Sequence, residues 1–236
     1  MIQVNLGFDK IAYCIFVKIG AILLMREIIF AEVNMSVYVL LAEGFEEIEA
    51  LSPVDYLRRS GLDVKILSCG KELVVRGSHG ISVVADKLVE QVLWSGGLSA
   101  SGGSAAVVVP GGMPGAANLS QCQAARDLLG RVSDAGGLVA ALCAAPVVVL
   151  AGWGLLRGRR YTCYPSMETQ LEKWGGSDWK ELTAGSQYTG SRVEVDGNLI
   201  TGAGPGAAEE FSLMLVRRLA GDGAARRLAS SALFRK

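Results

Sequence analysis

The sequence contains one histidine, His79, in 236 residues. Metal sites with nitrogen ligands, and hydrolases with a Ser-His-Asp or Cys-His arrangement, need histidine beside the reactive group. No local group of cysteine and carboxylate residues in the sequence takes its place. The sequence therefore predicts no metal site, and it places a cysteine peptidase or amidotransferase-like hydrolase last among the enzyme classes.

Disulfide patterns and an excess of basic charge are also missing. The cysteines are odd in number and form no C-x-x-C pair, which favours reduced thiols and a cytoplasmic protein. Lysine plus arginine number 23 and so do aspartate plus glutamate. This balance predicts no nucleic-acid partner and no anionic membrane partner, and it favours a small neutral or anionic substrate.

A long hydrophobic run is missing as well. Residues 11–25 are apolar, but Lys18 interrupts them and the run is shorter than the ~20 residues of a membrane-spanning helix. No A-x-A-like cleavage site follows, which disfavours an export signal. We predict an N-terminal extension over residues 1–34, outside the functional chain, and one domain over residues 35–236. The sequence does not decide between this interpretation and a signal.

After Met35 the chain alternates between strand and helix patterns. SVYVLLA (36–42) is an apolar strand, and in the helix that follows Ile48, Leu51, Val54 and Leu57 recur at helical spacing. A second strand over 62–69 completes a β-α-β unit and predicts a parallel sheet. Further strands are expected at 105–112 and 138–143, one or two short ones within 73–84, and a hairpin turning at Asp196-Gly197; helices are expected at 86–94, 120–135, 145–156, 166–174, 207–219 and 222–234.

The helix over 120–135 has a candidate start signal. Ser120 and Gln123 match a capping box, and Asn118 is available at the same turn.

Cys143 occupies the point where a buried strand ends and a helix is expected to begin. The positive end of a helix dipole lowers the pKa of a cysteine there, and ligands of open α/β sheets bind at the carboxyl ends of strands. The alternative is an inert buried thiol, which is common for free cysteine. The small residues around it, AALCAAP, favour a sharp turn that presents a reactive thiol.

Gly111 and Gly112 follow the neighbouring core strand. Their backbone amides, with that of Ala144, are placed to form an oxyanion hole beside Cys143. Simple turn chemistry explains a Pro-Gly-Gly sequence equally well.

Four segments in this order and spacing, EGFEEIE (43–49), PGGMPGAANLS (110–120), AALCAAP (140–146) and TGAGPGAAEEF (201–211), resemble the ThiJ/PfpI family. The resemblance covers about residues 35–234 and is strongest to the protein deglycase subgroup. It implies a flavodoxin-like three-layer α/β sandwich with a mostly parallel central sheet, a homodimer and no cofactor.

By the same resemblance Cys143 corresponds to the nucleophile, Glu49 to the carboxyl group that contacts it, and Gly112 and Ala144 to the oxyanion donors. A carboxyl group beside a thiolate must be protonated or repel it, so we expect Glu49 to have a raised pKa. The other acidic residues of the segment, Glu43, Glu46 and Glu47, are expected on a solvated helix face.

The sequence departs from the family pattern at Tyr164. Glyoxalase-type members have a histidine in the segment that matches TCYPS, and a phenol is a poor general base at neutral pH. His79 lies in a GSHG turn that resembles the dimer-contact segment. One hypothesis is that it acts in trans and, as a cation, lowers the pKa of Cys143 of the partner subunit; a histidine without chemistry is the simpler interpretation.

Two functions follow from these residues. The first is a cysteine-dependent deglycase or glyoxalase acting on reactive carbonyls such as methylglyoxal or their adducts. The second is a non-enzymatic redox sensor or holdase chaperone that uses oxidation of Cys143. Cys163 is expected in a buried strand, although a resolving thiol for oxidised Cys143 is an alternative.

Overall fold

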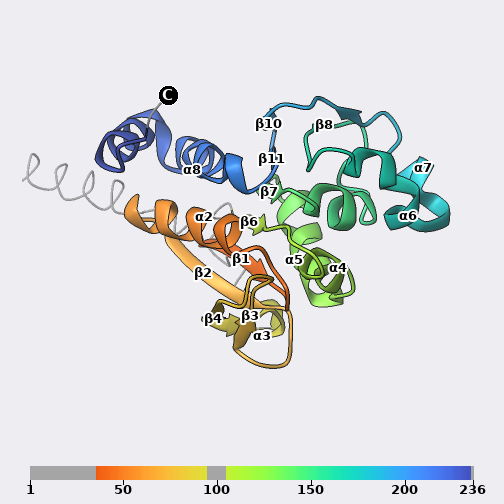
Figure 1. The fold of residues 1–236 in the computed structure, drawn as a ribbon, viewed down its shortest axis with the longest axis horizontal. Coiled ribbons are helices and arrows are strands. Elements are labelled where there is room, and N and C mark those ends of the chain that lie inside the picture. Colours follow the sequence, from red (N-terminus) through yellow and green to blue (C-terminus); the bar gives the residue numbers. More distant parts are fainter. Residues whose placement is uncertain (1–35, 95–104, 235–236) are drawn as a thin grey trace, which may run out of the picture. The chain divides into compact units, whose positions relative to one another are not determined.

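The computed structural model describes residues 36–94 and 105–234. Its centre is a seven-stranded sheet in the order β10-β11-β7-β6-β1-β2-β5 (Figure 1). All neighbouring strands are parallel except β10 and β11, which are antiparallel. The strands are β1 Ser36–Leu41, β2 Asp63–Ser68, β5 Lys87–Leu88, β6 Ala106–Val109, β7 Leu138–Leu142, β10 Val193–Asp196 and β11 Leu199–Gly202. The predicted α/β class with a mostly parallel sheet is confirmed.

Helices cover both faces of the sheet. Side chains of β1 alternate, so that Val37 and Val39 pack toward α2 (Glu47–Arg59) and α8 (Ala208–Ser231), while Leu40 packs on the other face. That second face is covered by α3 (Val89–Trp94), α4 (Gly115–Ser120), α5 (Gln123–Asp134) and the π-helix η1 (Pro146–Ala151). These three layers are those of the predicted flavodoxin-like sandwich.

Two further pairs of short strands lie outside the seven-stranded sheet. β3 (Val74–Arg76) and β4 (Ser82–Val84) form the antiparallel hairpin expected within 73–84. β8 (Arg160–Tyr161) pairs in parallel with β9 (Gln187–Tyr188), and short helical segments lie between them: η2 Met167–Gln170, α6 Leu171–Gly175, η3 Gly176–Asp178 and α7 Trp179–Leu182. Strand β9 and helix α7 are too short to give a periodic pattern, which is why they were not predicted.

The predicted capping box is wrong. Helix α5 begins at Gln123 with Cys122 as its cap residue, because Ser120 already ends the separate helix α4. The Ser120 hydroxyl donates to the Ala117 carbonyl at 2.7 Å, and the Asn118 side-chain amide donates to the Glu43 carbonyl at 2.7 Å. Asn118 therefore fixes the loop after β1 rather than a helix start.

In the C-terminal third of the chain, Gly197 lies in a hairpin turn and Gly221 interrupts a helix. Asp196 pairs with Leu199, so the hairpin turn consists of Gly197 and Asn198, one residue later than expected. Gly221 (φ 87°, ψ 165°) interrupts α8, so this helix has two arms, as predicted, and they follow the short 3₁₀ segment η4 (Pro205–Ala207).

Three expectations concern residues outside this part of the chain. The N-terminal extension over 1–34, the domain boundary at Met35 and the Gly/Ser-rich loop over 95–104 lie outside the described residues, and they stay predictions. Within residues 36–94 and 105–234, no helix has the length and apolar character needed to cross a membrane.

Candidate active site

Cys143 follows β7 in a strained turn. Its backbone has φ 58°, a left-handed conformation that costs a residue with a side chain roughly 1–2 kcal/mol. Two hydrogen bonds of 2.8 Å hold it there: the Cys143 amide donates to the Gly202 carbonyl, and the Tyr164 amide donates to the Cys143 carbonyl. The predicted sharp turn therefore exists, and the cysteine side chain is partly exposed.

Glu49 enters the same site from the first turn of α2, and its side chain is fully buried. The Gly111 amide donates to Glu49 Oε2 at 2.8 Å. Oε1 accepts no hydrogen bond of normal geometry from the described residues, and the carboxyl group interacts with the Cys143 thiol. The structure thus brings Glu49, Gly111 and Cys143 together from three separate segments of the sequence.

Burial raises the pKa of Glu49 from 4.5 to about 7, against the lowering effect of the Gly111 amide, and the charge of Glu46 raises it further. A carboxyl group without access to water is more stable in its neutral form. The raised pKa expected for Glu49 is confirmed.

The pKa of Cys143 is also raised, to about 12, first by burial and then by the charge and hydrogen bond of Glu49. The backbone amides of Gly112 and Ala144 lower it by less. The predicted lowering by a helix dipole is therefore wrong. The following helix, η1, has only six residues and begins at Pro146, so its dipole is small compared with the buried carboxylate.

Glu49 and Cys143 titrate as a pair, because the charge and hydrogen bond of Glu49 raise the pKa of Cys143, and the hydrogen bond with Cys143 lowers the pKa of Glu49. Removal of one proton leaves either a thiol beside a carboxylate or a thiolate beside a carboxylic acid. In the second form the Glu49 hydroxyl can donate to sulfur, and the repulsion that raises the pKa of Cys143 is gone.

The two glycines after β6 have different roles. A Cβ atom on Gly111 would lie 2.7 Å from Cys143 Cβ and 2.8 Å from Glu49 Oε2, so only glycine fits. Because the Gly111 amide binds Glu49, it does not face the thiol as an oxyanion donor, contrary to our expectation. The amides of Gly112 and Ala144 do interact with the Cys143 sulfur. Their role as an oxyanion hole stays a prediction.

Of the two accessory residues, Tyr164 lies beside Cys143, whereas His79 lies beside Glu47. Tyr164 is 52% exposed and is tied to Cys143 through the backbone, and its ring lies next to Gly204, where an added Cβ would be 3.4 Å from Cδ2. The imidazole of His79 is 70% exposed and its Nδ1 lies 2.9 Å from Glu47 Oε2 of the same chain. A role for His79 at the partner subunit's cysteine stays a prediction.

The expectation of a solvated helix face for Glu43, Glu46 and Glu47 is wrong. Glu43 is exposed but lies in the turn before α2, and Glu46 and Glu47 are buried. Glu46 is 8% exposed and accepts from the Glu49 amide at 2.7 Å, so it caps α2 and positions Glu49. Glu47 is 4% exposed and accepts from the amides of His79 at 2.7 Å and Ile81 at 3.3 Å.

Glu46, Glu47 and His79 form a group of residues of metal-ligand type, a combination that the expectation of no cysteine and carboxylate cluster did not cover. Their ligand atoms lie within 4.8 Å of one another. Both carboxylates already accept protein hydrogen bonds. We therefore attribute to Glu47 the anchoring of the turn after β3. No sequence pattern revealed this contact, because the partners are 32 residues apart.

Cys163 is completely buried, and burial followed by the charge of Glu168 raises its pKa to about 12. It lies just after β8. The expected burial of Cys163 is therefore confirmed, but its expected place in a strand is wrong, because β8 ends at Tyr161.

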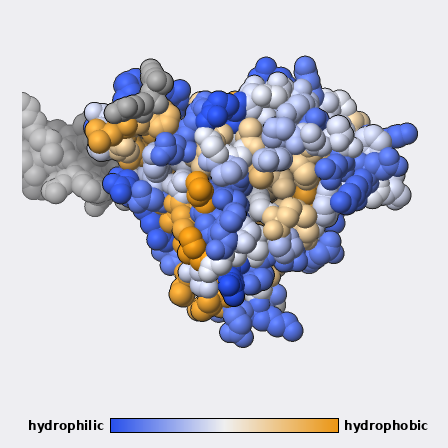
Figure 2. Space-filling model, in the orientation of Figure 1, coloured by the Kyte–Doolittle hydropathy of each residue, from blue (hydrophilic) through white to orange (hydrophobic). Residues whose placement is uncertain are grey.

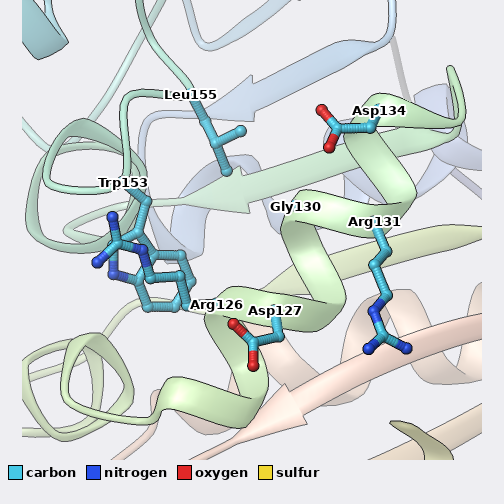
Figure 3. Close-up of a pocket in the computed structure, with 7 residues that line it drawn as sticks. All are labelled: Arg126, Asp127, Gly130, Arg131, Asp134, Trp153 and Leu155. Atoms are coloured by element: carbon cyan, nitrogen blue, oxygen red, sulfur yellow. The ribbon is translucent and has the colours of Figure 1, made fainter.

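A separate pocket of about 420 Å³ lies along α5 (Figure 3). Charged side chains of α5 line it together with Trp153 and Leu155, which follow η1. None of its lining residues is a cysteine, so it is distinct from the site around Cys143.

The fold and the site define a class: a three-layer α/β sandwich with a cysteine at a strained turn after a central strand and a buried glutamic acid beside it. Residues 35–218 match the DJ-1/PfpI family. The chain belongs to that family, as the resemblance predicted.

Individual relatives agree with this placement. The "Protein DJ-1 homolog B" of Arabidopsis thaliana is 37% identical over 180 residues, which are 76% of this chain and 37% of that protein. This chain spans less than half of the two Arabidopsis thaliana relatives, 37% of homolog B and 48% of homolog A. The "Glutathione-independent glyoxalase DJR-1.2" of Caenorhabditis elegans is 31% identical over 181 residues, 76% of this chain and 85% of that protein. The crystal structure of Drosophila melanogaster DJ-1beta has a TM-score of 0.73 and 35% identity, covering 86% of this chain and 99% of that one.

Proposed function

We propose that this protein is a cysteine-dependent enzyme, independent of a cofactor, that converts small reactive carbonyls such as methylglyoxal, or their early adducts on amines and thiols, into hydroxy acids. The observation that carries the proposal is the pairing of Cys143 with a buried carboxyl group whose pKa is raised to about 7. A group with that pKa both donates and accepts protons at neutral pH. The similarity to a glyoxalase of Caenorhabditis elegans supports the same chemistry.

The proposed reaction has three steps: addition of the thiolate, transfer of a proton between carbons, and hydrolysis. The Cys143 thiolate attacks the aldehyde carbon, and the Glu49 carboxylic acid protonates the resulting oxyanion, giving a hemithioacetal. Glu49, now a carboxylate, removes the proton from that carbon and returns one to the adjacent carbon through an enediol, which leaves a thioester of lactate. Water then cleaves the carbon–sulfur bond, so methylglyoxal and water become lactate and the thiol is regenerated.

The backbone amides beside Cys143 would stabilise the charged oxygen in these steps. Burial and the charge of Glu49 raise the pKa of Cys143 to about 12, whereas the amides of Gly112 and Ala144 lower it. These two amides therefore favour a negative charge at this position. With Tyr164 in place of histidine, Glu49 has to move the proton in every step. We therefore expect slow turnover.

A second candidate is a redox sensor or holdase. A partly exposed thiol between two amides and a carboxylic acid is also suited to a sulfinate, because Glu49 can donate to one of its oxygens. In that case peroxide would produce a stable oxidised Cys143, and methylglyoxal would not be consumed.

We also propose a homodimer, with a cytoplasmic location that keeps Cys143 reduced. Exposed hydrophobic surface lies over the β3–β4 hairpin (Figure 2), where Val74, Ile81 and Val84 are 58%, 55% and 67% exposed. Ile48 of α2, which its spacing predicted to be in the core, is 54% exposed as well. Apolar surface of this kind favours a protein partner, and a second copy of the chain is the simplest one.

Lactate formation from methylglyoxal by the purified chain tests the proposed enzyme. We expect steady production that is abolished in Cys143→Ser. Wild-type protein that forms no lactate but accumulates sulfinic acid at Cys143 under peroxide would support the sensor instead.

A further inference from the structure

Cys69 and Cys122 form a second thiol pair, which the proposed carbonyl chemistry does not use. Cys69 directly follows β2, and its amide donates to the Leu41 carbonyl at 2.8 Å. Cys122 is the cap residue of α5, and its amide donates to the Leu119 carbonyl at 2.9 Å. Both side chains are partly exposed free thiols that pack against the same hydrophobic cluster. A hydrogen bond joins the two thiols.

The surroundings of the two sulfur atoms differ. The pKa of Cys122 is lowered to about 7, chiefly by the hydrogen bond from Cys69 and further by the amides of Ala125 and Ala124. Burial and the charge of Glu90 act in the opposite direction. The same hydrogen bond and burial raise the pKa of Cys69 well above its ordinary value. At neutral pH Cys69 therefore stays protonated, whereas roughly half of the Cys122 thiols are ionised.

We propose that Cys122 and Cys69 form a dithiol that hydrogen peroxide oxidises to an intramolecular disulfide, with Cys122 as the attacking thiol and Cys69 as the resolving thiol. The Cys122 thiolate attacks one peroxide oxygen, the O–O bond breaks, and sulfenic acid and hydroxide result. The Cys69 thiol then displaces the sulfenic oxygen as water, forming the S–S bond. In total two thiols lose two electrons and peroxide becomes two waters, and a low-molecular-weight thiol reverses the change.

Cys69 is separate from Cys143. Cys69 follows β2 and Cys143 follows β7, and β1 and β6 lie between these strands in the sheet. Three strand spacings amount to ~14 Å, well beyond the ~7 Å limit between the Cα atoms of a disulfide. The sheet therefore keeps Cys69 from pairing with the proposed nucleophile.

Peptide mapping of the full chain tests this proposal. The reduced protein is treated with hydrogen peroxide at pH 7, the remaining thiols are blocked with N-ethylmaleimide, and trypsin is added without reductant. Cleavage after lysine and arginine places Cys69 in residues 66–71, Cys122 in 88–126 and Cys143 in 132–157. We expect peptide 66–71 to be linked to 88–126, and dithiothreitol to separate the two.

Two variants assign the roles. In Cys69→Ser, dimedone should label the sulfenic acid of Cys122, whereas in Cys122→Ser peroxide should leave Cys69 open to N-ethylmaleimide. In Cys69→Ala, alkylation of Cys122 at pH 7 should slow by roughly five- to tenfold, because its thiolate fraction falls more than its nucleophilicity rises. The proposal is overturned if peroxide oxidises Cys143 in the wild type while no linked peptide forms, or if dimedone labels Cys69. Neither outcome depends on lactate formation.

Discussion

Gly111 packs against Cys143 so closely that an added Cβ atom would lie 2.7 Å from the cysteine Cβ. The same atom would lie 2.8 Å from Glu49 Oε2 and 2.9 Å from the Ala144 amide. One glycine therefore sets the separation of the proposed nucleophile, its proton-transfer partner and an oxyanion donor. A change at this glycine disturbs all three at once.

We predict that Gly111→Ala lowers kcat/KM for methylglyoxal by about 100-fold, because a displacement of ~1 Å in an active site has that order of effect. The free energy of unfolding should fall by about 1–3 kcal/mol through overpacking. The matched control is Gly130→Ala in α5, where an added Cβ meets nothing within 4 Å. That variant should keep full activity and be as stable as the wild type or more so. Equal activity in both variants would contradict the described packing.

Glu49 makes stability depend on pH in a defined direction. Its pKa is 4.5 in the unfolded chain and about 7 in the folded one, chiefly because of burial, so the folded state binds more protons between these values. Stability is therefore fully present below about pH 4.5 and is lost as the pH rises through 7, by about 3 kcal/mol in total.

Urea unfolding of the wild type and of Glu49→Gln between pH 5 and 8 measures this effect. The difference in the free energy of unfolding between the two proteins should move in favour of the glutamine variant as the pH rises. A difference that stays constant over that interval would show that Glu49 ionises as easily in the folded chain as in the unfolded one.

Glu46→Gln should shift the titration of the pair without destroying the site. After burial and the opposing Gly111 amide, the charge of Glu46 is a further cause of the raised pKa of Glu49. Glutamine keeps an oxygen that can accept from the Glu49 amide but removes that charge. We expect the pH profile of Cys143 alkylation to show its lower transition at a more acidic pH than in the wild type. An unmoved or more alkaline transition would exclude this electrostatic contribution.

The proposed dimer predicts the effect of a charge on β4. Val84→Glu places a carboxylate in the exposed hydrophobic surface of the β3–β4 hairpin, so light scattering should show a shift from dimer to monomer. Leu233→Glu is the control, since Leu233 is 83% exposed at the other end of the described chain. A wild type that is already monomeric, or a dimer unaffected by Val84→Glu, would reject this interface.

The sequence was sufficient for the architecture. The apolar runs that form β6 and β7 are too short for helices and too apolar for exposed strands, so they indicate buried strands. Because helices separate these strands in the sequence, a parallel sheet is predicted. The position of Cys143 followed from the same reasoning, because the cysteine ends one of these runs.

The electrostatics of the site were not accessible in this way. The pKa of Cys143 is raised rather than lowered because of burial and of Glu49, which comes from helix α2. Glu47 can be buried because the amides of His79 and Ile81 donate to it. Periodicity also placed Ile48 in the core, whereas the first turn of α2 directs Glu49 inward. These features arise from contacts between distant segments, and no local pattern encodes them.

The central claim is that the Glu49 carboxyl group and the Cys143 thiol act as one catalytic unit, and a double-mutant cycle of methylglyoxal turnover tests it most directly. Lactate formation is measured for the wild type, Cys143→Ser, Glu49→Gln and the double variant, with folding checked by circular dichroism. We predict that Glu49→Gln lowers kcat at least about 100-fold, and that the double variant is no less active than Cys143→Ser alone. Independent losses that multiply in the double variant, or a Glu49→Gln variant with near wild-type kcat, would contradict the account.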